Sequence, residues 1–217
     1  MQVFLDKGFR SAGISDVAKA LGLSHGAVYT YADSKQALLY LALLQVLDPE
    51  ALETMELPVR APEAERIVAT VERWAAPQRG FDKLAEALSG PAQGSAEREL
   101  GEIVEEIYDF IDQNRPILAL FERCSEDLPA LSQWYFVERR RGLLAALAEF
   151  LNARIEAGLL RPVPDVPTAA RFIVETIAWF SMHRHGDPDS AMLTDEDCRR
   201  TVRSLVPAAF LPSGEPR

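Results

Sequence analysis

The chain has 217 residues, nearly half of them apolar, and a formal net charge of −10 at pH 7. This length allows one large or two small domains with a substantial core. The sequence shows no apolar run of membrane-spanning length, no charged segment leading into a short apolar one, and only two distant cysteines, Cys124 and Cys198. These features exclude a membrane span, a signal peptide and a disulfide framework, so we expect a cytoplasmic protein.

Two short helices separated by a tight turn are predicted near the N-terminus. An apolar stripe that ends at Leu21 predicts the first helix, and Gly22 ends it because glycine accepts a positive φ. Ser24 is a suitable N-cap for a second helix over residues 25–31. This layout is typical of the helix-turn-helix, which presents its second helix to the major groove of DNA.

A third helix is predicted to begin at Ser34, and its N-terminal amides and dipole favour a phosphate. Lys35 adds a positive charge there, so its replacement by alanine is expected to weaken binding to all DNA sequences alike. Phosphate contacts are predicted for Tyr31 and Lys35, and base-edge contacts for His25, Gly26 and Thr30. The complete predicted DNA-binding set is Ser24, His25, Gly26, Thr30, Tyr31 and Lys35.

This region resembles the DNA-binding domain of the tetracycline-repressor (TetR) family of bacterial regulators. The matching residues are Phe4, Gly8, Phe9, Val17, Ala18, Gly22, Leu23, Ser24, Gly26, Val28, Tyr29, Tyr31, Ser34, Lys35 and Leu38. The resemblance implies a homodimer with an N-terminal reading domain and a C-terminal helical domain that binds a small effector and dimerises. The first helix is shorter than the family's and looks truncated, and the departures from the family pattern are Ala12, Gly13 and Ala32.

The acidic charge is unevenly distributed. Residues 1–47 carry four basic residues and three aspartates, a net charge of +1, so the remainder carries −11. This division is compatible with DNA binding by the N-terminal end and argues against binding along the whole surface.

Sparse β-branched residues and recurring 3.6-residue periodicity predict an all-α protein. Residues 1–47 are predicted to form the helix-turn-helix domain, and residues 48–217 the effector-binding and dimerisation domain. Helices are predicted over residues 34–55 (with a bend at Pro49), 63–76, 81–88, 96–113, 118–124, 131–157 and 169–182, and from residue 194 onward.

The last two predicted helices are candidates for a dimer interface. Residues 169–182 contain only two charged side chains, and a helix that is apolar almost all round is buried on more than one side. The final helix begins at the N-cap Thr194 and carries an apolar stripe. The alternative is that both helices complete a monomeric core. The predicted interface residues are Phe172, Ile173, Ile177, Phe180, Cys198, Val202, Leu205 and Ala209.

Aromatic and soft side chains in the middle of the chain are candidates for an effector pocket, because pockets in helical bundles are mostly apolar with a few polar groups. Ordinary core packing is the competing interpretation for each of them. The predicted ligand is bulky and largely apolar. The predicted pocket residues are Phe81, Phe110, Phe121, Cys124, Trp134, Trp179 and His183.

These patterns predict a ligand-responsive transcriptional regulator: a homodimer that represses from a palindromic operator in double-stranded DNA and is released by a small effector. One alternative is a helical protein-interaction module that has lost DNA binding. An enzyme is a further alternative, but the chain shows no phosphate-binding glycine loop, zinc helix or nucleophile elbow. His183 and His185 lie two residues apart, a spacing that does not share a helix face, so no metal or other cofactor is expected.

Overall fold

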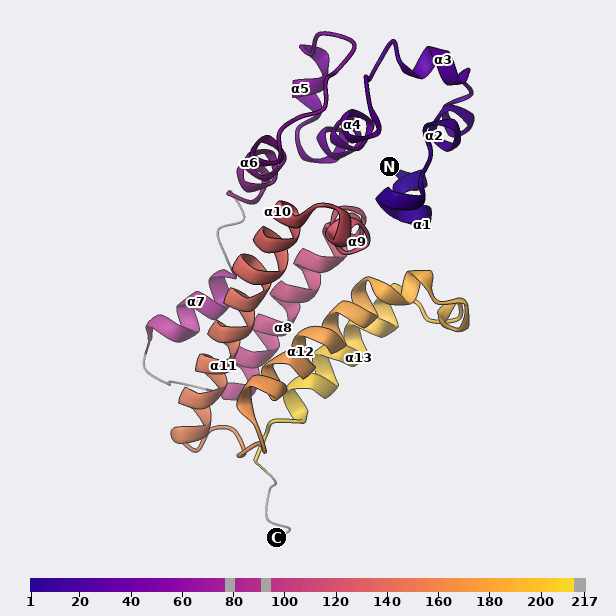
Figure 1. The fold of residues 1–217 in the computed structure, drawn as a ribbon. Helices are drawn as coiled ribbons and strands as arrows, with labels where there is room; N and C mark the ends of the chain where they lie inside the picture. Colours follow the sequence, from indigo (N-terminus) through magenta and orange to yellow (C-terminus); the bar gives the residue numbers. More distant parts are fainter. Residues whose placement is uncertain (77–80, 91–94, 213–217) are drawn as a thin grey trace. The chain divides into compact units, whose positions relative to one another are not determined.

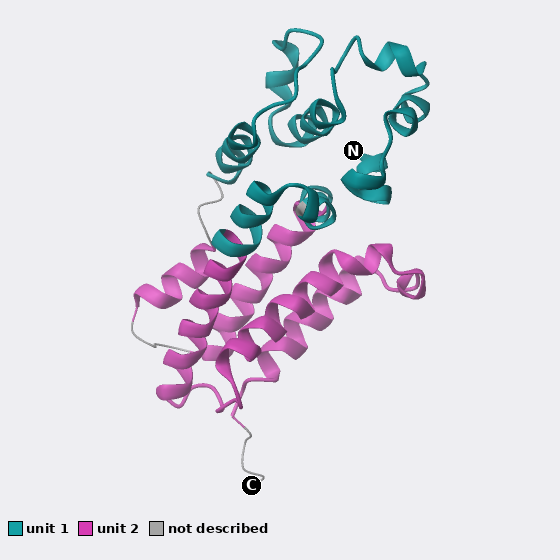
Figure 2. Ribbon diagram, viewed as in Figure 1, with its two compact units in different colours: residues 1–78, 116–138 teal, residues 79–115, 139–217 magenta. Residues whose placement is uncertain are grey.

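A computed structural model of the protein describes residues 1–76, 81–90 and 95–212. Within these ranges all regular elements are helices, apart from a single β-bridge between Ala32 and Val59, so the all-α prediction is confirmed (Figure 1). No helix in these ranges is long and apolar enough to cross a membrane. The chain divides into two compact units, residues 1–78 with 116–138 and residues 79–115 with 139–217 (Figure 2).

The first unit combines the N-terminal helices with a later segment of the chain. Its helices are α1 (Gln2–Ser11), α2 (Ile14–Leu21), α3 (His25–Val28), α4 (Lys35–Leu47), α5 (Pro49–Glu53), α6 (Ala64–Ala75), α9 (Arg115–Cys124) and α10 (Pro129–Ser132). A 3-10 turn over Ser125–Asp127 joins α9 to α10, and a π-helical segment over Gln133–Arg140 follows α10. The predicted domain boundary after residue 47 therefore falls inside a compact unit, because α5, α6, α9 and α10 belong to the same unit as α1–α4.

The second unit is a bundle of long helices. Its members are α7 (Asp82–Ser89), α8 (Ala96–Gln113), α11 (Arg141–Glu156), α12 (Val166–Ser181) and α13 (Asp195–Ala208). Its core is made of fully buried side chains from four of these helices, among them Ile103, Ile107, Leu147, Phe150, Ile173, Ile177 and Val202. Within this unit, α8 contacts both α12 and α13, and α12 contacts α11, so α12 lies at the centre of the packing.

Local sequence signals begin and end these helices. Gly22 adopts φ 69° directly after α2, as predicted, and Gly158 likewise adopts φ 71° after α11. Ser24, Ser34 and Thr194 each accept a backbone N–H from three residues ahead and so cap the helices that follow them. These groups satisfy backbone atoms that a helix end would otherwise leave unpaired.

Three predicted helices differ from the structure. The helix predicted over residues 34–55 is divided at Asp48, because Pro49 lacks the N–H that would continue α4 and Asp48 instead caps α5. The helix predicted over residues 131–157 is a continuous run that includes the π-helical segment. Of the helix predicted over residues 25–31, only His25–Val28 is α-helical, and residues 29–31 form turns.

Candidate nucleic-acid interface

The turn between α2 and α3 is fixed by its own backbone and side chains. Gly13 donates its N–H to the Asp16 carboxylate at 2.9 Å, which holds the start of α2, and Leu23 donates its N–H to the Ala18 carbonyl at 2.9 Å. Ser24 Oγ accepts the Ala27 N–H at 3.1 Å and starts α3. The structure therefore confirms the helix-turn-helix geometry that the glycine and serine positions predicted.

Leu21 was predicted to pack on the inner stripe of α2, and this prediction is wrong. Its side chain is 62% exposed, whereas Ala18 is buried and Leu23 is half-buried. The reason is the left-handed turn at Gly22, which reverses the chain so that Leu23 rather than Leu21 enters the small core between the helices.

The outer face of α3 and the turn after it bring most of the predicted DNA-binding residues onto one exposed surface. Gly26 has no heavy atom within 4 Å of the position a Cβ would take, and Thr30 Oγ donates to the Ala27 carbonyl at 2.7 Å. Ser24, His25, Thr30 and Tyr31 are also exposed. Exposed polar side chains on a short helix are the groups that read base edges in a major groove.

Tyr29 belongs to this surface and was missed. Its side chain is 42% exposed, and its ring lies edge-on to His25 with 5.5 Å between the centroids. The spacing was the available signal, because residues four apart on a helix lie on the same face. The His25–Tyr29 pair adds an exposed aromatic group to the surface.

Lys35 is placed differently from its predicted role. Its Nζ donates to the Arg10 carbonyl at 3.0 Å and lies 4.6 Å from the centre of the Phe9 ring. The ammonium group therefore binds the C-terminal end of α1 by a charge-assisted hydrogen bond and a cation–π contact. In this arrangement Lys35 fixes α1 against the start of α4.

Arg10 also connects α1 to the turn that follows α9. Its backbone N–H donates to Asp127 Oδ2 at 3.0 Å, and its Nε donates to Asp127 Oδ1 at 3.2 Å. Arg123 Nη2 donates to the Asp6 carbonyl at 3.2 Å, close to Gly8, which breaks α1 with φ 72°. We name the contacts of Arg10 with Lys35 and Asp127 the Arg10 clamp.

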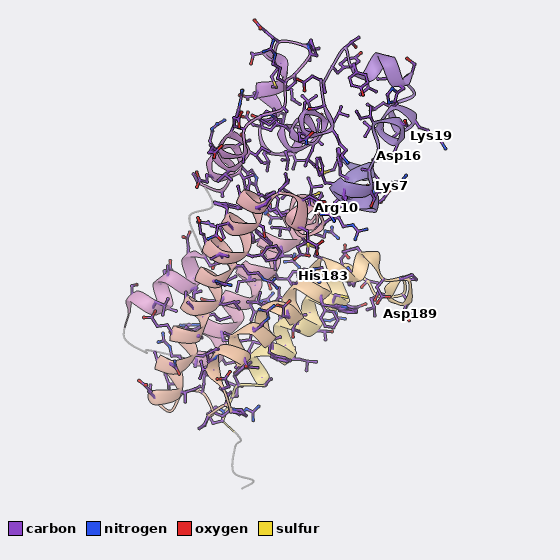
Figure 3. The ribbon with its side chains drawn as sticks, in the orientation of Figure 1. Lys7, Arg10, Asp16, Lys19, His183 and Asp189 are labelled. Carbon is purple, nitrogen blue, oxygen red and sulfur yellow. The ribbon has the colours of Figure 1, made fainter. Side chains whose placement is uncertain are left out.

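Lys7 and Asp16 form a second link, between α1 and α2 (Figure 3). Lys7 Nζ donates to Asp16 Oδ1 at 2.6 Å, and this bond, followed by that of the Gly13 N–H, lowers the pKa of the Asp16 carboxyl below its ordinary value. The two hydrogen bonds stabilise the charged form of the carboxylate.

Asp16→Asn is expected to lower the melting temperature at pH 7. A depressed carboxyl pKa contributes stability that is present above the unfolded value and is lost as the pH falls through the folded value. Thermal unfolding followed from pH 7 to pH 2 should therefore show the difference between the two proteins shrinking below about pH 4. If the two melting temperatures differed by the same amount from pH 7 to pH 2, the lowered pKa of Asp16 would be contradicted.

The predicted pocket residues lie in both units. Phe121, Cys124 and Trp134 are buried in the first unit, where the Phe121 and Trp134 rings lie 6.0 Å apart, and burial raises the pKa of the Cys124 thiol. Phe81 and Phe110 pair edge-to-face in the second unit at 5.5 Å. Trp179 and His183 are exposed on the second unit. The predicted pocket residues therefore form separate aromatic pairs within each unit and do not line one continuous pocket there.

An open hollow of about 470 Å³ lies in the second unit, between α11 and the start of α12. It is lined by Leu144, Ala145, Ala148, Pro167, Thr168 and Arg171. None of these residues belongs to the predicted pocket, and Arg171 Nε is already 3.1 Å from Glu175 Oε1. The location of an effector site stays a prediction.

The predicted dimer residues fall into two groups. Ile173, Ile177, Cys198 and Val202 are buried in the core of their own unit, so their side chains are not available to a partner. The outward members are Phe172, Phe180, Leu205 and Ala209, of which Phe172 is 52% and Leu205 62% exposed. The α13 stripe differs from the expected one because Val206 completes the buried row that begins at Cys198 and continues at Val202, which turns Leu205 outward.

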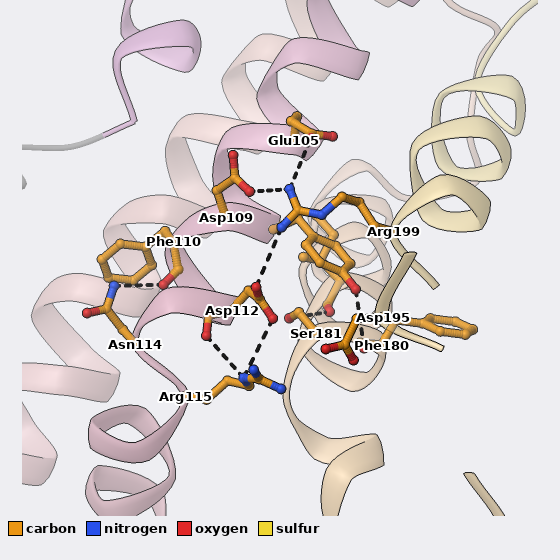
Figure 4. Close-up of polar contacts among 12 residues, drawn as sticks. Glu105, Asp109, Phe110, Asp112, Asn114, Arg115, Phe180, Ser181, Asp195 and Arg199 are labelled. Atoms are coloured by element: carbon orange, nitrogen blue, oxygen red, sulfur yellow. Dashed lines mark hydrogen bonds and ion pairs between the residues drawn. The ribbon is translucent and has the colours of Figure 1, made fainter. Parts of the chain in front are cut away.

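An ion-pair network fixes α13 against α8 in the second unit (Figure 4). Arg199 lies 3.0 Å from Glu105 and 3.5 Å from Asp112, and it also pairs with Asp109. Tyr108 on α8 donates its hydroxyl to the Phe180 carbonyl at 3.5 Å. These contacts set the positions of α12 and α13 and hence of the side chains that face outward from them.

The comparisons with known proteins agree with this geometry. Residues 1–40 match the family model described as bacterial regulatory proteins, tetR family. PfmR, a TetR family transcriptional regulator from Thermus thermophilus, is 20% identical with a TM-score of 0.52, over 95% of this chain and 93% of that one. KstR2, a ketosteroid transcriptional regulator of Mycobacterium tuberculosis, is 16% identical with a TM-score of 0.57, over 98% and 91%. No curated protein matches the sequence significantly.

Proposed function

From the membership of this chain in the tetR family of bacterial regulatory proteins, carried by residues 1–40, we propose that it is a ligand-responsive repressor that binds a palindromic operator as a homodimer. The observation that carries the proposal is the exposed face of α3, held by the Gly22 turn and the Ser24 cap. A dimer would present two such helices to successive major grooves, roughly 34–36 Å apart.

Each residue of the interface has a proposed role. His25, Gly26 and Thr30 approach base edges, with Tyr29 beside His25, while Tyr31 binds a phosphate. The Ser24 hydroxyl accepts the Ala27 N–H at the start of α3, so Ser24 contributes mainly by positioning the helix. Lys35 acts through the Arg10 clamp, because its ammonium group is already bonded to α1.

The proposed effector is a small, largely apolar molecule. The edge-to-face pairs in the two units supply apolar surface of the required kind, and the structural neighbour KstR2 is named for ketosteroids, which are bulky and largely apolar. The effector shifts the balance between two states only by its differential affinity for them. The Arg10 clamp is the proposed route within the first unit, because it joins α1 to the segment that contains α9.

A protein-interaction module without DNA binding is the second candidate. The net charge of residues 1–47 is only +1, and Lys7, Arg10 and Lys35 are all bonded to groups of their own unit. This leaves a small electrostatic contribution for attracting phosphates.

Selection from a random duplex library separates the two candidates. The repressor is expected to enrich a two-fold symmetric sequence, to shift it in a gel with an affinity that falls steeply with salt, and to release it when an apolar effector is added. Recovery of unrelated sequences with no salt-dependent shift would support the interaction module. His25→Ala should change the enriched bases, because direct contacts to base edges carry sequence preference.

A further inference from the structure

The loop between α5 and α6 is bonded to the segment that leaves the recognition helix. Val59 donates its N–H to the Tyr31 carbonyl at 2.8 Å, and its own carbonyl accepts the Asp33 N–H at 3.0 Å. Asp33 Oδ1 accepts the Ala61 N–H at 3.1 Å. Three hydrogen bonds therefore fix the backbone on both sides of Arg60.

The burial pattern indicates the direction of the Arg60 side chain. Val59 and Ala32, the two bridged residues, are buried, whereas Arg60 and Tyr31 are exposed. Successive side chains of extended backbone point to opposite sides. Arg60 therefore lies on the outer side of the bridge, the side that also carries Tyr31 and Asp33.

In the part of the chain that the structure describes, Arg60 differs from most basic side chains of the N-terminal region in having no internal partner. Residues 1–62 contain five basic side chains, and three of them are bonded internally: Lys7 to Asp16, Arg10 to Asp127, and Lys35 to the Arg10 carbonyl. Within the described residues, Lys19 and Arg60 form no ion pair or side-chain hydrogen bond. A cation that is free of internal partners is the one available to an external anion.

We propose that Arg60 binds a backbone phosphate of the DNA next to the one bound by Tyr31, so that the α5–α6 loop extends the nucleic-acid interface. The proposal rests on the proposed DNA-binding function. A guanidinium presents several N–H donors in a plane and suits a phosphate oxygen pair. Because its backbone is fixed by the bridge, Arg60 loses less freedom on binding than an arginine on an unsupported loop.

The test measures how affinity depends on salt for wild type, Arg60→Gln and Arg60→Lys. The probes are a labelled 30-bp duplex of mixed sequence and the duplex enriched by selection. Each phosphate contact contributes about 0.9 to the slope of log K against log salt concentration, so Arg60→Gln should lower that slope by about 0.9. Between 50 and 200 mM salt, wild type would then lose about 3.5-fold more affinity than the variant. Arg60→Lys should keep the wild-type slope.

Arg73→Gln is the matched control, because it removes the same charge from α6 at a side chain that is also exposed. It should leave the slope unchanged, and circular dichroism should be the same for all variants. An unchanged slope for Arg60→Gln, with wild type binding normally, would overturn the role of Arg60 and leave the repressor function intact. Wild type that binds neither duplex in a salt-dependent manner would overturn both.

Discussion

Phe172→Asp is expected to dissociate the proposed homodimer and, with it, operator binding. Phe172 and Leu205 are large apolar side chains that lie mostly exposed on α12 and α13, and Trp179 lies two turns after Phe172 on the same helix. Central aromatic residues of an interface each contribute about 2–4 kcal/mol, so the dimer dissociation constant should rise roughly 30- to 1000-fold. Sedimentation equilibrium measures this directly.

Met192→Asp is the control for an exposed apolar side chain on the same unit. Met192 lies in the turn before α13 and is 77% exposed, so a carboxylate there should leave the dimer unchanged. Leu205→Asp should act in the same direction as Phe172→Asp. A Phe172→Asp protein that stays dimeric and binds DNA would show that the outward face of α12 and α13 is not the interface.

Arg154→Leu is expected to destabilise the second unit strongly. Arg154 on α11 is only 2% exposed, donates to Glu99 at 2.7 Å and to the Ala87 carbonyl at 2.8 Å, and lies over the Phe150 ring. It therefore joins α7, α8 and α11. Removing one partner of a buried pair leaves the other charge unpaired and costs about 3–5 kcal/mol. Urea denaturation should show this as a lower midpoint at a similar slope.

Two further variants separate charge burial from packing. Arg98→Ala removes an arginine whose pair with Glu102 is largely exposed, so its cost should stay below about 1 kcal/mol. The double variant Arg154→Leu/Glu99→Leu should recover part of the stability lost in the single one, because no unpaired carboxylate remains. If Arg154→Leu and Arg98→Ala lowered the free energy of unfolding equally, burial of the ion pair would not determine its contribution to stability.

The sequence predicted those features that depend on a few neighbouring residues. Gly22 can adopt the left-handed turn that ends α2, because glycine has no Cβ, and Ser24 and Thr194 need only the N–H three residues ahead. Packing between distant segments was not predictable in this way. Leu205 and Val206 are both apolar, and only the contacts of α13 with α8 and α12 decide which of them is buried.

The candidate site shows the same division. The exposed face of α3 follows from its motif, so His25, Gly26 and Thr30 lie where they were expected. The inward direction of Lys35 depends on the Arg10 carbonyl, which is 25 residues away. Arg60 belongs to no sequence motif, because only the pairing of Val59 with Ala32 brings it to the side of the bridge that carries Tyr31.

The first unit is assembled from two stretches of chain, residues 1–78 and 116–138, and this has a consequence for protein synthesis. At about 5–20 residues per second, the ribosome needs several seconds to pass from residue 78 to residue 138. During that interval Asp127 has not yet been made to meet Arg10, and Trp74 lacks the Phe121 ring that it packs against at 6.4 Å. The N-terminal part of the first unit is thus translated first but completed late, with apolar surface open to chaperones until α9 and α10 emerge.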